Sequence, residues 1–165
     1  MMTKYSPIKR LAAFGVVAII LAACSAPTRD VSGSGYSSSS SGSDQGSSVS
    51  AKYLVENVGD RVFFSTDRSV LDASARGTLV RQADWLKQNA GISLTIEGHA
   101  DERGTREYNL ALGARRANAV RDFLISQGVN ADRLQTISFG KERPVSLCSE
   151  ESCWSKNRRS VSTIR

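Results

Sequence analysis

Residues 51–165 predict an α+β domain of two layers, with two helices packed on one face of a small four-stranded sheet. Short runs of alternating apolar and polar side chains are interspersed with two long segments whose apolar side chains recur every three or four residues. Each predicted element therefore has one apolar side. Placing both helices on the same face of the sheet buries all of these sides together.

The first predicted strand is the short run 61–64. A helix follows it, because apolar residues then recur at the three- and four-residue steps of one helix face. These residues are Leu71, Ala75, Leu79, Ala83 and Leu86. Gly91 follows the end of this helix, where glycine is common. Trp85 lies beside the stripe, and we expect it to pack in the core.

The second strand is predicted over 92–97, where apolar and polar residues alternate. The second helix is predicted over 105–127, because it begins with a threonine, which is a favoured N-cap, and Gly128 follows its end. Residues 134–139 are the third predicted strand and residues 160–164 the fourth.

Residues 1–23 predict a signal peptide. Lys4, Lys9 and Arg10 precede residues 11–23, a run of thirteen residues without a charge. As a helix this run would span about 20 Å, which is short of the roughly 30 Å hydrocarbon core of a bilayer. A positive flank followed by a short apolar run is typical of a signal peptide and not of an anchoring helix.

The end of this segment, Leu21-Ala22-Ala23-Cys24, resembles the lipobox of bacterial lipoproteins. The resemblance implies cleavage before Cys24 and lipid chains on that residue. Two or more chains anchor a protein stably to a membrane. Ser25 stands where an aspartate tends to retain lipoproteins at the inner membrane, so we expect attachment to the outer membrane. An ordinary secretory signal with an incidental cysteine is the alternative.

Residues 24–50 predict a disordered tether behind the lipidated cysteine. Residues 25–50 include twelve Ser and four Gly, with few large apolar side chains. Such a segment cannot bury enough surface to offset the entropy of ordering it. As a flexible coil it would span about 30 Å.

Length and charge exclude two classes of function. A chain of 165 residues with a long tether is too short for a multidomain enzyme. Of its 22 Lys and Arg, three lie in the signal peptide, and the remaining 19 against 16 Asp and Glu leave a net charge of +3. This excess is too small to indicate nucleic-acid binding.

The segment 97–105, between the second strand and the second helix, is the candidate binding site. Free N–H groups at a helix start attract anions, and Asp101 beside them can bind a cation. Asn109 and Arg116 lie on one face of the helix, and their side chains tilt toward its N-terminus. Arg116 can therefore reach back toward Asp101, whereas Arg115 points about 100° away.

An aspartate and an arginine at a helix start suit a zwitterion, such as an amino acid or the amino-acid end of a peptide. Asp101 would take the ammonium and Arg116 the carboxylate. In that case removing either side chain should abolish binding with little loss of stability. Alternatively, Asp101 and Arg116 pair with each other, and removing either lowers stability. Spacing alone does not decide between these alternatives.

Six segments between residues 64 and 159 resemble the OmpA-like peptidoglycan-binding domain family and, within it, the peptidoglycan-associated lipoproteins. The matching runs are 64–67 with Leu71, 95–105, 107–113, 115–120, 138–144 and 157–159. The resemblance implies an OmpA-like sandwich with a mixed sheet, and noncovalent binding of the diaminopimelate side chain of peptidoglycan. Matched by position, Asp101 holds the ammonium and Arg116 the carboxylate. The other residues implied to line the pocket are Asp67, His99, Arg103 and Asn109.

The resemblance further implies a nonenzymatic protein that links the outer membrane to the cell wall and faces the periplasm. It implies membership of the Tol-Pal system in envelope integrity and cell division, with TolB as a partner that competes with peptidoglycan. The alternatives are a wall-binding subunit of another envelope complex and a peptidoglycan hydrolase. No cofactor is expected.

His99 is the only histidine of the chain. Catalytic zinc usually has three protein ligands, often including more than one histidine, so we expect neither a metal nor catalysis here. We interpret His99 as a hydrogen-bonding wall of the pocket. For Arg158 and Arg159 two interpretations stay open, a ligand contact and an ion pair at the sheet edge.

Cys148 and Cys153 remain once Cys24 carries lipid. An exported chain meets an oxidising periplasm, so we predict a disulfide that closes a short loop. Two reduced thiols are the alternative.

Overall fold

The computed structural model describes residues 50–165. The predicted signal peptide, Cys24 and the tether up to residue 49 lie outside the described residues. The described part begins with a helical turn at 50–53 that continues into a π-helical segment, η1 (Leu54–Val58). Within residues 50–165, every helix is too short or too polar to cross a bilayer.

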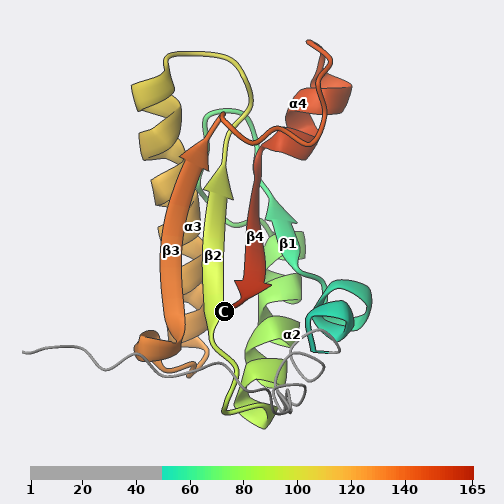
Figure 1. Cartoon of the computed structure of the whole chain (residues 1–165), viewed down its shortest axis with the longest axis vertical. Helices are drawn as coiled ribbons and strands as arrows, with labels where there is room; N and C mark the ends of the chain where they lie inside the picture. The colour runs from blue at the N-terminus through green and yellow to red at the C-terminus, as the bar shows by residue number, and fades with distance from the viewer. Residues whose placement is uncertain (1–49) are drawn as a thin grey trace, which may run out of the picture. The chain divides into compact units, whose positions relative to one another are not determined.

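Within residues 50–165, four strands form one mixed sheet in the order β1-β4-β2-β3 (Figure 1). The strands are β1 (Arg61–Phe63), β2 (Leu94–His99), β3 (Leu134–Gly140) and β4 (Arg159–Ile164). β4 runs antiparallel to β1 and β2, whereas β2 and β3 are parallel. In this register Glu97 lies opposite Val161 on one side and Ile137 on the other.

Two helices, α2 (Ala73–Gln88) and α3 (Arg106–Ser126), cover one face of this sheet (Figure 1). The predicted α+β class and its two layers are therefore confirmed. α3 begins at the predicted cap, since the Thr105 side chain accepts a hydrogen bond from the Tyr108 N–H. The five apolar residues of the predicted first helix are buried in the core, but Leu71 lies just before α2, which begins after its cap Asp72, and Trp85 packs in the core too.

Three elements escape prediction: the helical segment that ends in η1, the 3-10 turn η2 (Ala131–Arg133) and the helix α4 (Glu151–Asn157). α4 has seven residues and no apolar stripe, so its order comes from tertiary contacts rather than from local pattern. It lies beyond the end of the sheet where β2 and β3 terminate (Figure 1). Cys148, which precedes α4, and Cys153, which lies within it, form a disulfide with a Cα–Cα distance of 5.5 Å.

β2 occupies residues 94–99 and not the predicted 92–97. Ile92 belongs to the turn after α2, where its N–H donates to the Asn89 carbonyl, and its half-buried side chain packs against the core. The strand extends through His99 because β3 pairs with it as far as Gly140.

Helix and sheet touch without an intervening side chain where α3 crosses β2. A Cβ on Gly98 would overlap the carbonyl oxygen of Gly113, and a Cβ on Gly113 would lie 2.8 Å from the Gly98 oxygen. This contact holds the first turns of α3 beside the end of β2. It therefore positions the connecting segment of residues 100–105, called the site loop below.

We predict that Gly98→Ala lowers the free energy of unfolding by about 2–3 kcal/mol, because the new methyl group meets backbone atoms that cannot rotate away. Gly77→Ala in α2 is the control, since a Cβ there meets nothing within 4 Å. Alanine should stabilise the helix at that position by about 0.5–1 kcal/mol. Urea unfolding measures both. Equal stabilities of the Gly98 variant and the wild type would contradict the close packing of α3 on β2.

Candidate functional site

A cavity of about 320 Å³, called the site cavity, lies where the loop after β1 meets the site loop and the start of α3. Its lining residues are Thr66, Asp67, Asp101, Arg103, Gly104, Tyr108, Asn109 and Leu112. Three segments distant in sequence thus meet here. Four of the six residues expected to bind the ligand line this cavity: Asp67, Asp101, Arg103 and Asn109.

The site loop is held in place by backbone hydrogen bonds and a buried amide. Ala100 N–H donates to the carbonyl of Gly140 at 2.7 Å. Gly104 turns the chain with φ +88°, a left-handed conformation that suits glycine. The buried Asn109 donates through Nδ2 to the carbonyls of Arg103 (2.8 Å) and Thr105 (3.1 Å). Asn109 therefore fixes the shape of the loop.

Asp101 is a buried carboxylate whose charge two arginines balance. Its Oδ1 accepts from the Arg103 N–H and Nε, and its Oδ2 accepts from Arg103 Nη2 at 2.7 Å and Arg158 Nη1 at 3.3 Å. Burial raises the pKa of Asp101, but the hydrogen bonds from Arg103 and Arg158 outweigh it and hold the pKa below its ordinary value. Asp101 is therefore ionised at neutral pH.

Arg116 does not pair with Asp101, so the predicted alternative of a mutual ion pair is wrong. Its guanidinium is fully buried behind the cavity wall. Each nitrogen donates to a backbone carbonyl: Nε to Arg68 (2.8 Å), Nη1 to His99 (2.8 Å) and Nη2 to Ser65 (3.2 Å). Burial lowers the pKa of Arg116 to about 10, which leaves it charged at pH 7.

Arg116 thereby joins two parts of the site. Ser65 and Arg68 belong to the loop of residues 64–72, and His99 is the last residue of β2. The expectation that Arg116 could be removed with little loss of stability is corrected by this arrangement, because three carbonyls would lose their donor.

Asp67 carries the accessible negative charge of the cavity. It is exposed and adopts φ +56°, a left-handed conformation in which aspartate is one of the tolerated residue types. The Tyr108 hydroxyl donates to its carboxylate. Within residues 50–165 no Lys, Arg or His forms an ion pair with Asp67. Its carboxylate thus differs from that of Asp101, which two arginines occupy.

Arg103 carries the accessible positive charge. Its side chain is 40% exposed and lies between Asp101 and the Thr66 hydroxyl, which accepts from Nη2 at 3.4 Å. Exposed charges of both signs, together with the start of α3, therefore surround one cavity. Tyr108 and Thr66 were missed from the sequence, although Tyr108 precedes Leu112 by one helical turn and so shares its face.

The His99 ring lies outside the site cavity. Ile96 faces the core, so Glu97 lies on the opposite face of the sheet, and His99 Nε2 is 3.4 Å from the Glu97 carboxylate. The ring stacks on Phe139, and neither ring nitrogen has a hydrogen-bond partner within residues 50–165. The expectation of a hydrogen-bonding pocket wall is therefore corrected, because strand alternation turns the ring away. No three metal-binding side chains gather anywhere in the described part of the chain.

Of the two interpretations left open for Arg158, the structure shows the ion pair, with the carboxylates of Asp101 and Glu151 as partners. Arg159 differs, because within the described residues its side chain donates to two carbonyls, those of Asn157 and Arg143, and forms no ion pair. β4, which begins with Arg159, lies between β1 and β2, so this residue is not at the edge of the sheet, where the ion-pair interpretation placed it.

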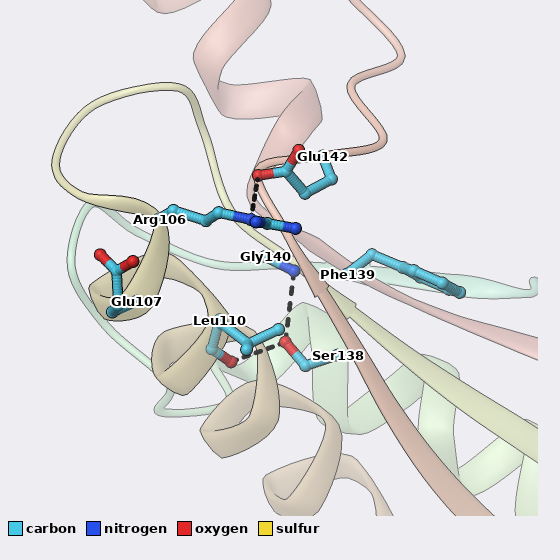
Figure 2. Close-up of a pocket in the computed structure, with 7 residues that line it drawn as sticks. All are labelled: Arg106, Glu107, Leu110, Ser138, Phe139, Gly140 and Glu142. Carbon is cyan, nitrogen blue, oxygen red and sulfur yellow. Dashed lines mark hydrogen bonds and ion pairs between the residues drawn. The ribbon is translucent and has the colours of Figure 1, made fainter.

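A larger cavity of about 540 Å³ lies along the other flank of α3, and Figure 2 shows its lining. Its charged and polar groups are largely paired already. Arg106 and Glu142 form an ion pair at 3.2 Å, and the Ser138 hydroxyl bonds both the Leu110 carbonyl and the Gly140 N–H. The smaller site cavity, with its accessible Asp67 and Arg103, is therefore the better candidate for a charged ligand.

Comparison with known proteins gives consistent matches. The OmpA family matches residues 63–158. The peptidoglycan-associated lipoprotein of Mesorhizobium japonicum is 62% identical over 115 residues, which are 70% of this chain and 68% of that protein. That of Haemophilus influenzae is 38% identical over 157 residues, 93% of this chain and 95% of that protein. The crystal structure of the peptidoglycan-associated lipoprotein from Burkholderia pseudomallei aligns with a TM-score of 0.63 at 39% identity, covering 64% and 90% of the two chains.

We predict that Arg116→Ala lowers the free energy of unfolding by about 3 kcal/mol or more, because three carbonyls lose their donor. The exposed neighbour Arg115 is the matched control, and Arg115→Ala should change stability by less than about 0.5 kcal/mol. Chemical denaturation measures both. An unchanged midpoint for Arg116→Ala would show that this side chain does not join the two loops.

We also predict that the domain loses stability between pH 6.5 and pH 4 because of His99. Burial, followed by the nearby Arg159 and Arg143, lowers the pKa of His99 from 6.5 to about 4. The unfolded chain binds this proton first, so the free energy of unfolding falls as the pH decreases, by up to about 3 kcal/mol. His99→Gln should flatten the profile in this interval. Parallel profiles of the two proteins would refute the assignment.

Proposed function

The chain belongs to the OmpA family, among its peptidoglycan-associated lipoproteins, and from this we propose that it binds the diaminopimelate side chain of peptidoglycan without covalent chemistry. One observation carries this proposal. Accessible charges of opposite sign, Asp67 and Arg103, line one small cavity at a helix start, together with the buried carboxylate of Asp101, which is hydrogen-bonded to Arg103.

The free end of diaminopimelate is an amino-acid zwitterion, with an ammonium and a carboxylate on one carbon. Its ammonium would lie against Asp67, whose carboxylate forms no ion pair within residues 50–165, and beside Asp101, whose charge Arg103 and Arg158 already balance. Its carboxylate would face the start of α3, where unpaired N–H groups and the helix dipole favour an anion. The Arg103 fork lies beside the same point.

Arg116 acts on the ligand carboxylate through its buried positive charge. The guanidinium lies behind the wall, and its hydrogen bonds fix the 64–72 loop that carries Asp67. Direct contact between Arg116 and a carboxylate would require one of those carbonyls to be released. Arg116 would thus favour the ligand carboxylate through its positive charge, and the ligand ammonium by holding the loop that carries Asp67.

The expected affinity is modest for a single site. A few charge-assisted hydrogen bonds, each contributing about 1.5–3 kcal/mol, correspond to a dissociation constant in the micromolar range. Many copies that face one polymeric wall gain avidity without further contacts. Reversible binding of this kind would link the outer membrane to the cell wall while both can still grow.

The cellular part of the proposal rests on the lipobox-like segment and on the relatives. Lipid on Cys24 would anchor the chain in the outer membrane, and the tether would let the domain reach the wall from the periplasmic side. The protein would act in the Tol-Pal system, in envelope integrity and cell division, with TolB competing for an overlapping surface. Its role is binding and not catalysis.

We predict that the wild-type protein sediments with purified diaminopimelate-containing sacculi and that Asp101→Ala loses at least about 90% of this binding, since the variant removes the carboxylate that orients Arg103 and Arg158 at the cavity. Asp122→Asn, an exposed carboxylate near the far end of α3, is the matched control and should bind like the wild type. Free meso-diaminopimelate should release the protein, whereas lysine should not.

Three results would count against the proposal. Asp101→Ala could sediment like the wild type, sacculi with lysine in place of diaminopimelate could bind equally well, or the protein could release soluble fragments from the wall. The last result would indicate a hydrolase.

A further inference from the structure

Helix α4 contacts the residues that line the site cavity. The Trp154 ring lies over the Arg103 guanidinium, with 4.1 Å between the guanidinium carbon and the ring centroid. The indole N–H of Trp154 donates to the Glu102 carboxylate at 3.1 Å. One side chain of α4 thus touches two consecutive residues of the site loop.

A second path runs from α4 to the buried carboxylate of the site. Glu151 accepts hydrogen bonds from Arg158, and Arg158 Nη1 donates onward to Asp101 Oδ2 at 3.3 Å. Arg158 is buried, and its Nε donates to the Phe64 carbonyl at 3.0 Å. Because its fork is shared between two carboxylates, the position of Glu151 sets the orientation of Arg158 on Asp101.

α4 needs an external tie to present these side chains. Seven residues of helix are too few to be stable alone in water. The Cys148–Cys153 disulfide supplies a covalent tie at its first turn, since it encloses Glu151 and ends next to Trp154. At the other end Asn157 bonds the backbone of Val145 and Ser146.

We propose that the disulfide-closed α4 is a positioning element for the site cavity, in which Trp154 and Glu151 hold Arg103 and Arg158 in the geometry that binds the ligand. This inference rests on the function proposed above. Closing the disulfide orders these side chains before the ligand arrives, so binding costs less entropy. Reduction by a dithiol breaks the S–S bond, leaves two thiols and converts the dithiol to its cyclic disulfide. The helix start is then freed, and affinity falls.

The test uses the full-length protein and a soluble probe, the tripeptide L-Ala-γ-D-Glu-meso-diaminopimelate, in a calorimetric titration. Loss of ordering at one or two side chains should weaken binding about threefold to tenfold. We expect this loss in the double variant Cys148→Ser/Cys153→Ser, in Trp154→Leu and in Glu151→Gln. Dithiothreitol should weaken the wild type equally and leave the double-serine variant unchanged.

Two further variants separate positioning from general damage to the fold. Trp154→Phe keeps an aromatic face over Arg103 and should restore most of the affinity that Trp154→Leu loses. Lys156→Ala changes an exposed residue of the same helix that touches no site residue and should bind like the wild type. In a Trp85→Phe background, the fluorescence of Trp154 should shift on reduction at a temperature at which far-UV circular dichroism shows that the domain stays folded.

The outcomes distinguish this inference from the proposed function. If the oxidised wild type does not bind the tripeptide, the proposed function fails and the inference fails with it. If the wild type binds and the double-serine, Trp154→Leu and Glu151→Gln variants bind equally well, only the inference is overturned. If the double-serine variant unfolds, Trp154→Leu and Glu151→Gln decide by the same criterion.

Discussion

The site depends on one buried cation. Arg116 carries its charge into the interior and is tolerated there because three backbone carbonyls accept its N–H groups. Those carbonyls belong to the 64–72 loop and to the last residue of β2, so a single guanidinium sets the distance between the two segments. Asp67 and Asp101 face one cavity because Arg116 holds the chain on both sides of it.

The charges around this cavity have different tasks. Asp101 is saturated by Arg103 and Arg158, so it organises its neighbours and contributes less free negative charge than its ionised state would indicate. Asp67 keeps an accessible carboxylate, steadied by the Tyr108 hydroxyl. The zwitterion that we propose as the ligand would therefore meet a site whose internal ion pairs are already formed. Of the charged residues around the cavity, only Asp67 and the exposed part of Arg103 would remain accessible to this ligand.

Much of the fold follows from local pattern, and much of the site does not. The stripe from Leu71 to Leu86 and the Thr105 cap identify α2 and α3, because helix period and capping act within a few residues. The position of the His99 ring depends on strand alternation near a register shift. Because the predicted strand ended at residue 97, whereas β2 continues to His99, the face of the sheet on which this ring lies was not predicted. The pairing of Arg158 with Asp101 could not be predicted, because Arg158 is far away in sequence and is brought close only by β4 inserting between β1 and β2.

The two ends of the sheet have different neighbours. Ser50 and Tyr53 lie beside Trp85 and Asn89 at the C-terminal end of α2, and Arg133 joins Asn89 to the turn before β2. The site cavity lies at the other end of β2. A mechanical load applied between Ser50 and the site cavity would therefore run along the strands. The β1–β4 hydrogen bonds, which are perpendicular to the strands, would then resist shear together and would not unzip one at a time.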